Sequence, residues 1–172
     1  LMQDILTCAM GLDVHRDIIV ACLVKGAVDA EPEAETRTFS TLIPEMQKLR
    51  DWVIESECRN IAMESTGIYW QPIYEMLESC FDGEISILVV NARHMKNVPG
   101  RKTDMKDAQW IATLLRAGLL KGSFIPDKAF RELRHLTRYR KSVVHDITAQ
   151  KNRIDKFLQS SGFRFTAFLS DT

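Results

Sequence analysis

The sequence lacks any apolar run approaching the roughly 20 residues that a helix needs to span a bilayer. Its first residues, LMQDILTCAMGLD, have no basic start and no small-residue cleavage site, so we expect a strand there and not a secretory signal. The four cysteines include no CxxC pair and have no histidine at zinc-like spacing. We therefore expect no membrane span, and the apolar runs around Cys8 and Cys22 favour buried thiols in a reducing, cytoplasmic compartment.

The chain also lacks net charge, because 23 Lys and Arg balance 23 Asp and Glu, but the charges are segregated. Residues 1–90 hold 6 basic against 16 acidic side chains, a balance of −10, and residues 91–156 hold 16 against 6, a balance of +10. Segregation on this scale favours a polyanion partner such as nucleic acid for the basic half. Attraction between the two halves, or an acidic partner protein, remains the alternative.

At 172 residues the chain can form one domain with a hydrophobic core and a short appendage. Helical spacing of apolar residues predicts helices over 42–56, which Thr41 would cap, and over about 69–80. Apolar and alternating runs predict strands over 5–14, 18–25, 36–39, 59–64 and 85–90, the first two as a hairpin and the last as a central parallel strand.

Beyond residue 90 the pattern becomes helical. An apolar stripe from Ala108 to Leu115 lies behind Asp104, and Gly118 can end that helix. Asp127 then begins a long helical stretch to about Gln159. Its apolar positions are sparse and close to heptad spacing, namely Phe130, Leu133, Leu136, Val144, Ile147, Ile154 and Leu158. Such a narrow seam predicts pairing with another helix, as in a coiled coil.

The order of three strands, helix, strand, helix, strand, helix is that of the ribonuclease H-like fold. We therefore expect an α/β domain over residues 1–122, with a five-stranded mixed sheet flanked by helices. Residues 123–172 would form a long basic helical arm.

Four acidic residues occupy positions that this fold would bring together. Asp104 and Asp107 lie three residues apart, on one face near the start of a predicted helix. Asp13 and Glu64 each end an apolar run that predicts a strand. Four such carboxylates can hold Mg²⁺ or Mn²⁺, and such a site suits phosphodiester chemistry. The alternative is structural, because strands often end in polar residues and helices often begin with Asp.

Several segments resemble the N-terminal half of the insertion-sequence 110 transposases, a family that also includes the Piv-type DNA invertases. These segments are GLDVHRD (11–17), MESTGIYW (63–70), VVNARHMKNVPGRKTDMKDAQWIATLLRAGLL (89–120) and RELRHLTRYRKSVV (131–144). The resemblance implies a resolvase-like catalytic domain whose Asp-Glu-Asp-Asp set corresponds to Asp13, Glu64, Asp104 and Asp107. It also implies Mg²⁺ as cofactor and DNA strand cleavage and exchange during transposition.

Family members use a structured guide RNA in some cases and continue into a second domain with a nucleophilic serine. We therefore expect the chain to be an excised catalytic domain with the start of a helical arm, which would pair with a second copy. Basic residues would contact DNA or RNA, both near the acids and on the arm. They are Arg93, His94, Lys96, Arg101, Lys102 and Lys106, followed by Arg131, Arg134, Arg138, Arg140, Lys141, Lys151, Arg153 and Lys156.

Two other functions compete with a nuclease. In the first, the acids are structural and the chain is a non-catalytic module for nucleic-acid binding and dimerisation. In the second, the domain binds ATP, but the turn after Asp13 is HRD and has no glycine to let backbone amides approach a phosphate.

Several side chains around the acids have more than one interpretation. A turn histidine such as His15 is more often a surface residue than part of a site. Tyr69 and Trp70 can stack on a base, although a core position is favoured, and Ser65 and Thr66 are better suited to cap a helix than to act as nucleophiles.

Overall fold

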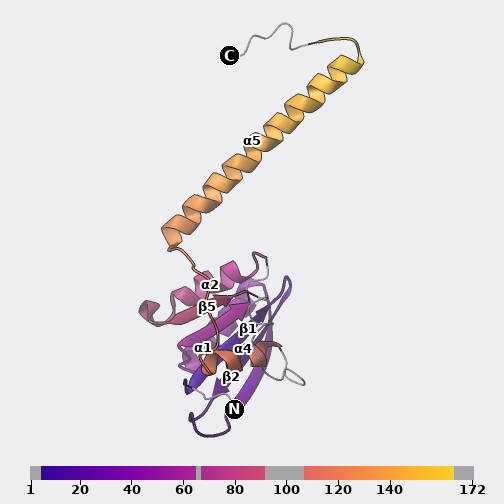
Figure 1. The fold of residues 1–172 in the computed structure, drawn as a ribbon. Helices are drawn as coiled ribbons and strands as arrows, with labels where there is room; N and C mark the ends of the chain where they lie inside the picture. Colours follow the sequence, from indigo (N-terminus) through magenta and orange to yellow (C-terminus); the bar gives the residue numbers. More distant parts are fainter. Residues whose placement is uncertain (1–4, 65–66, 92–106, 165–172) are drawn as a thin grey trace. The chain divides into compact units, whose positions relative to one another are not determined.

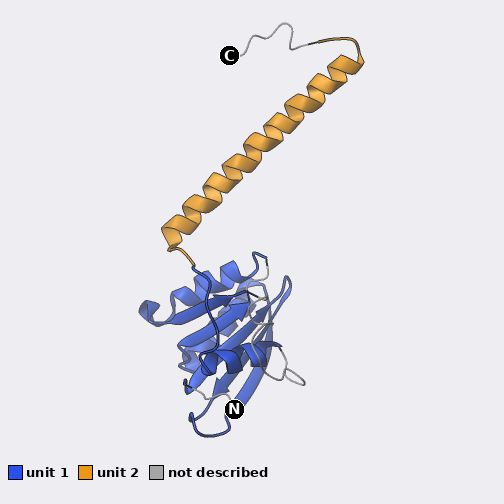
Figure 2. Cartoon of the chain, viewed as in Figure 1, with its two compact units in different colours: residues 1–124 blue, residues 125–172 orange. Residues whose placement is uncertain are grey.

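The computed structural model describes residues 5–64, 67–91 and 107–164, and the chain divides into two compact units, residues 1–124 and 125–172 (Figure 2). The boundary expected from the sequence, after residue 122, lies two residues before the one observed after residue 124. In chain order the elements are β1 (Cys8–Val14), β2 (Ile18–Lys25), β3 (Glu33–Ser40), α1 (Ile43–Glu55), β4 (Asn60–Glu64), α2 (Trp70–Glu78), the 3-10 turn η1 (Cys80–Gly83), β5 (Ser86–Val90), α4 (Asp107–Arg116) and α5 (Lys128–Ser160) (Figure 1).

The first unit is built on a five-stranded mixed sheet with the strand order β3-β2-β1-β4-β5. β1 pairs antiparallel with β2, and β2 pairs antiparallel with β3. β4 is parallel to β1, and β5 is parallel to β4. The strand with Asp13 is therefore the central one, and the strand with Glu64 is its neighbour. This is the ribonuclease H-like arrangement predicted from the order of elements.

Successive residues of β1 face opposite layers, as the pleat of a strand requires. Ala9 packs in one buried cluster with Ala62 of β4 and Ile111 of α4, so the odd-numbered residues of β1 face α4. On the other face, the ring of Phe39 in β3 lies 6.1 Å from that of Trp52 in α1. α2 contacts α1, so helices cover both faces of the sheet.

α4 ends where the sequence predicts. The N–H of Gly118 donates to the carbonyl of Leu115, and the N–H of Leu119 donates to the carbonyl of Leu114, each at 3.0 Å. This pair of bonds is the Schellman motif, which requires a left-handed residue, and Gly118 has φ of +68°. The predicted stripe on this helix is confirmed, because Ala108, Ile111, Ala112 and Leu115 are all buried.

Two local predictions are wrong. Thr41 does not cap α1, because its hydroxyl donates to the carbonyl of Arg16 at 2.9 Å and the helix begins after Leu42 with no side-chain cap. β5 is not central but last in the sheet order, although Val89 and Val90 are buried. The segment after α4 covers this strand, since the N–H of Ser123 donates to the carbonyl of Val89 at 2.7 Å.

The second unit consists largely of α5. The carboxylate of Asp127 accepts a hydrogen bond from the N–H of Phe130 at 3.0 Å, so the predicted start of this helix is confirmed. The helix continues without a break to Ser160. Among the described residues, no helix combines the length and the apolar character needed to cross a membrane.

Candidate functional site

Asp13 and Glu64 lie at the same edge of the sheet. In the parallel pairing of β1 with β4, Leu12 is opposite Met63, so Asp13 and Glu64 occupy the next positions of the two strands. Side chains at matching positions of neighbouring strands project from the same face. For these two carboxylates that face is the one covered by α4, because Asp13 follows Gly11 by two residues and Glu64 follows Ala62 by two.

Gly11 brings α4 very close to the central strand. A Cβ atom at Gly11 would lie 2.1 Å from the carbonyl oxygen of Ala108 and 2.5 Å from the amide nitrogen of Ala112, so only glycine allows this approach. Asp107 immediately precedes Ala108 and is the first residue of α4. The contact at Gly11 therefore anchors the start of α4 beside the strand end that carries Asp13.

The orientation of α4 supports the same placement. The N–H groups of Ile5 and Leu6 both donate to the carbonyl of Arg116, the last residue of α4. Since Ala108 packs on Gly11 and Arg116 lies beside the residues before β1, the helix runs antiparallel to this strand. Its amino-terminal turn therefore lies at the carboxyl end of β1. Negative side chains are favoured in that turn by the helix dipole.

Three of the four predicted acids thus belong to one edge of the domain, and Asp104 lies outside the described residues. Within residues 5–64, 67–91 and 107–164, no three His, Cys, Asp or Glu side chains lie close enough together to hold a metal ion. For Asp13, Glu64 and Asp107 the structure gives the strand and helix ends that carry them, and in the described part of the chain these three side chains do not form a group of metal ligands.

His15 contacts the predicted site more directly than its position in a turn indicates. Its Nε2 atom lies 3.1 Å from Oδ2 of Asp13, a hydrogen bond when that nitrogen carries the proton. The side chain of Asp13 is only 14% exposed, whereas that of His15 is 56% exposed. The imidazole therefore lies on the solvent side of the carboxylate and restricts its rotation.

The aromatic pair after β4 is divided between two environments. Tyr69 is exposed, which contradicts its predicted place in the core. Trp70 is half-buried and packs edge-to-face against Tyr74, with ring centroids 5.6 Å apart. Ser65 and Thr66, which precede this segment, lie outside the described residues.

The basic residues predicted near the acids, from Arg93 to Lys106, lie outside the described residues. On α5, Arg131 differs from its neighbours because it is buried and its Nη1 donates to the carbonyl of Pro126 at 2.8 Å. The other predicted contacts on this helix are all exposed, namely Arg134, Arg138, Arg140, Lys141, Lys151, Arg153 and Lys156. The apolar seam is exposed as well, with Phe130 at 65% and Ile154 at 60%.

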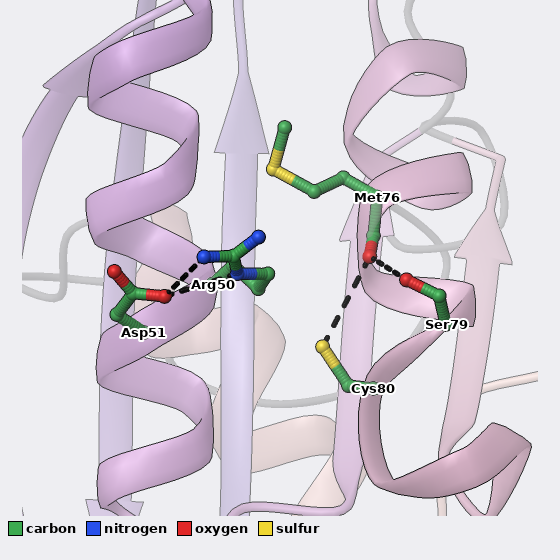
Figure 3. Close-up of polar contacts among 5 residues, drawn as sticks. All are labelled: Arg50, Asp51, Met76, Ser79 and Cys80. Atoms are coloured by element: carbon green, nitrogen blue, oxygen red, sulfur yellow. Dashed lines mark hydrogen bonds and ion pairs between the residues drawn. The ribbon is translucent and has the colours of Figure 1, made fainter.

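A hollow that no sequence motif indicates lies between α1 and η1, with a volume of about 460 Å³. Its lining includes Arg50, Ile54 and Phe81. Arg50 is held by an ion pair with Asp51 at 2.6 Å, so its charge is already compensated (Figure 3). The hollow is lined by neither Asp13, Glu64 nor Asp107.

The strand order defines a ribonuclease H-like domain, with an aspartate next to last in the central strand and a glutamate as the last residue of its parallel neighbour. Comparison with protein families then identifies the particular group: the model for the insertion-sequence 110 transposases with a DEDD domain, described as "Transposase", matches residues 10–162. The chain belongs to this family. The resemblance recognised in the sequence motifs is confirmed.

Among solved structures, two of RuvC from Thermus thermophilus are similar to this chain. The first, titled "Thermus thermophilus RuvC structure", is 12% identical with a TM-score of 0.45, and the match covers 67% of this chain and 99% of that one. The second, RuvC in complex with a Holliday junction substrate, is 13% identical with a TM-score of 0.44, and the match covers 69% and 100%. Among curated proteins there is no match.

Proposed function

We propose that this transposase domain cleaves DNA strands during transposition, with divalent metal ions held by Asp13, Glu64, Asp104 and Asp107. The observation that supports the proposal most is the placement of Asp13 and Glu64 on adjacent parallel strands, next to the first turn of α4 with Asp107. Carboxylate oxygens are the ligands that Mg²⁺ and Mn²⁺ prefer, so this set of residues fits the ion.

The positions of the acids indicate different roles. Asp13, on the central strand, would be the ligand shared by the two ions of a two-metal site. Glu64 would bind one ion, and Asp104 with Asp107 the other. Bound ions would supply activation of the attacking oxygen and stabilisation of charge on the phosphate. The hydrogen bond from His15 would hold the carboxylate of Asp13 in one orientation.

The direct test is titration of Mn²⁺ into the protein by calorimetry, with wild-type and Asp13→Asn proteins, and cleavage of plasmid DNA in the same buffer. We expect Asp13→Asn to weaken Mn²⁺ binding at least about tenfold and to slow cleavage roughly 10³-fold, because a bridging ligand contributes several kcal/mol. The control is Asp17→Asn in the same turn, since the side chain of Asp17 is 84% exposed. Equal Mn²⁺ affinity in all three proteins would contradict the proposal.

A second candidate function remains the non-catalytic module for nucleic-acid binding and dimerisation. It is favoured by the observation that the described acids do not form a closed group of three ligands. This module would bind DNA without any divalent ion and would show no change in melting temperature when Mn²⁺ is added. The titration therefore separates the two functions.

We infer that α5 contacts nucleic acid through one set of residues and a second copy of the chain through another. A helix in a protein gains most of its stability when its apolar face packs against another element. In α5 that face includes Val144 and Ile147, and about half of the surface of each is exposed. Arg134 and Arg138 are exposed cations that can contact phosphates of DNA or of a guide RNA.

Two double variants of α5 test this assignment. Val144→Asp with Ile147→Asp is expected to abolish self-association in sedimentation experiments, because charge in a helix seam opposes pairing. Arg134→Glu with Arg138→Glu is expected to leave self-association unchanged but to weaken DNA binding roughly tenfold or more at low salt. A wild-type protein that sediments as a monomer at all concentrations would exclude pairing. DNA affinity that is insensitive to salt would exclude phosphate contacts.

Strand exchange, as distinct from cleavage, requires that the energy of the broken phosphodiester be conserved in a covalent intermediate. We propose that the nucleophile is the serine of a second domain, as the family resemblance implies, and that the acids of this domain assist it. A structured RNA would guide the choice of DNA, as in some family members.

A further inference from the structure

Two thiols lie together at the end of the sheet opposite to Asp13 and Glu64. Cys8 is the first residue of β1, and Cys58 lies two residues before β4. Their side chains are hydrogen-bonded to each other, and both are free thiols. Asn60 binds to both residues, because its Nδ2 donates to the carbonyl of Cys8 and its own carbonyl accepts from Sγ of Cys58, each at 3.4 Å. Asn60 and the pairing of β1 with β4 therefore hold the two cysteines side by side.

The two thiols differ in accessibility and in charge. Cys8 is half-buried, which differs from the fully buried position expected from the sequence, whereas Cys58 is fully buried. The hydrogen bond with Cys58, with the positive charges of Lys25 and Arg116, lowers the pKa of Cys8 to about 7 despite its partial burial. The same hydrogen bond and burial raise the pKa of Cys58. The pKa values of the two thiols therefore shift in opposite directions, and Cys8 is the sulfur that ionises more readily.

We propose that Cys8 and Cys58 form an oxidation site, at which hydrogen peroxide or an organic hydroperoxide converts the two thiols into a disulfide. This inference is independent of the metal site and of DNA cleavage. It assigns to the domain a second, redox-sensitive site at the amino ends of β1 and β4.

The reaction proceeds in two balanced steps. The thiolate of Cys8 attacks one oxygen of hydrogen peroxide, the O–O bond breaks, and a sulfenic acid and hydroxide form. A proton from the solvent, equivalent to the one that Cys8 released on ionising, converts the hydroxide into one water. The sulfur of Cys58 then attacks the sulfur of Cys8, its proton leaves with the departing oxygen as a second water, and the S–S bond forms. In total the two thiols lose two electrons and the peroxide gains them.

Two other cysteines serve as internal controls. Cys80 lies in the corner between α1 and η1, where its Sγ is 4.0 Å from the carbonyl oxygen of Met76 (Figure 3). Burial raises the pKa of Cys80, so at neutral pH it keeps its proton. Cys22 is buried in β2, with its Sγ 4.0 Å from the carbonyl oxygen of Leu23. Both thiols are buried, so neither is accessible to a peroxide in the solvent.

The test is mass spectrometry of the whole 172-residue protein after exposure to hydrogen peroxide, alkylation with iodoacetamide after unfolding, and proteolysis. We expect linked peptides that contain Cys8 and Cys58, while Cys22 and Cys80 are alkylated. Cys58→Ala should stop at a Cys8 sulfenic acid that dimedone traps, and Cys80→Ser should behave as wild type. Alkylation of both Cys8 and Cys58 after peroxide treatment, or a disulfide between two copies of the chain, would overturn the proposal.

Two further measurements distinguish this site from an ordinary buried thiol. Alkylation of Cys8 in the folded protein should be half-maximal near pH 7 and fall below that pH, because only the thiolate reacts. Cys58→Ala should move this midpoint upward, because the hydrogen bond to the thiolate is lost. The disulfide closes the loop of residues 8–58, so the oxidised protein should melt roughly 5 °C higher than the reduced one. A wild-type midpoint near that of a free cysteine would contradict the assignment of Cys8 as the attacking thiol.

Discussion

Gly11→Ala is expected to lower the free energy of unfolding by about 3 kcal/mol or more, at the upper end of what overpacking of a core costs. The added Cβ would lie 2.1 Å from a backbone oxygen of α4, so rotation of a side chain cannot relieve the contact. Either the helix or the strand must move by about 1 Å to reach ordinary van der Waals separation. Urea unfolding followed by circular dichroism measures the loss.

The same substitution should weaken Mn²⁺ binding, because Asp107 follows α4 as it moves away from Asp13. The matched control is Gly122→Ala, where the added Cβ would meet Cδ2 of Leu88 at 2.8 Å, the far end of a flexible side chain. This control should cost less than about 1 kcal/mol and should leave Mn²⁺ affinity unchanged. Similar losses of stability in the two variants would show that the approach of α4 to β1 is less tight than the structure indicates.

Arg116→Ala is expected to cost about 3–5 kcal/mol of folding free energy, because three backbone carbonyls each lose a hydrogen bond to a charged donor. Arg116 is only 1% exposed. Its Nε donates to the carbonyl of Leu6 at 2.9 Å, and its Nη2 donates to the carbonyls of Gly26 and Ala27 at 3.1 and 2.5 Å. Removal of the side chain leaves a cavity as well as three carbonyls without this donor.

Arg116→Lys should recover part of this loss, because an ammonium group keeps the charge but lacks the planar fork that reaches several carbonyls at once. Lys48→Ala is the control, since it removes an exposed ion pair with Glu45 that contributes less than about 1 kcal/mol. Thermal unfolding of the wild-type protein and the three variants gives the order of their stabilities. An Arg116→Ala protein as stable as Lys48→Ala would show that the cost of burying the guanidinium cancels the gain from its hydrogen bonds.

The edge that carries the acids could be predicted from the sequence, because Asp13 and Glu64 each end a distinct run of apolar residues. In a parallel pairing, the carboxyl ends of neighbouring strands meet at the same edge, so the positions of Asp13 and Glu64 follow from the order of elements. The stripe on α4 predicted which face of that helix packs on the sheet. Both predictions rest on periodicity, which is a local property of the chain.

The features that escaped prediction depend on contacts between distant segments. Thr41 is a favourable capping residue by type, but its hydroxyl has a competing acceptor in the turn before β2. The apolar run of β5 resembles a central strand because a later segment covers it. Cys8 and Cys58 are too far apart in sequence for any spacing motif, and only the pairing of β1 with β4 brings them together. Nothing in the sequence around Gly11 distinguishes a glycine that allows a helix to pack closely on the strand from one that forms a β-bulge.

The central position of β1 has a consequence for the order in which the domain can form. β1 leaves the ribosome before the other strands of its sheet, yet its parallel neighbour β4 begins only at Asn60 and the helix that covers its odd-numbered face ends at Arg116. The hydrogen bond from Arg116 to Leu6 spans 110 positions in the sequence. Contacts of such long range make folding slow and keep early intermediates open. The β1–β2 hairpin, with its apolar surface exposed, therefore stays incomplete during synthesis until α4 has emerged.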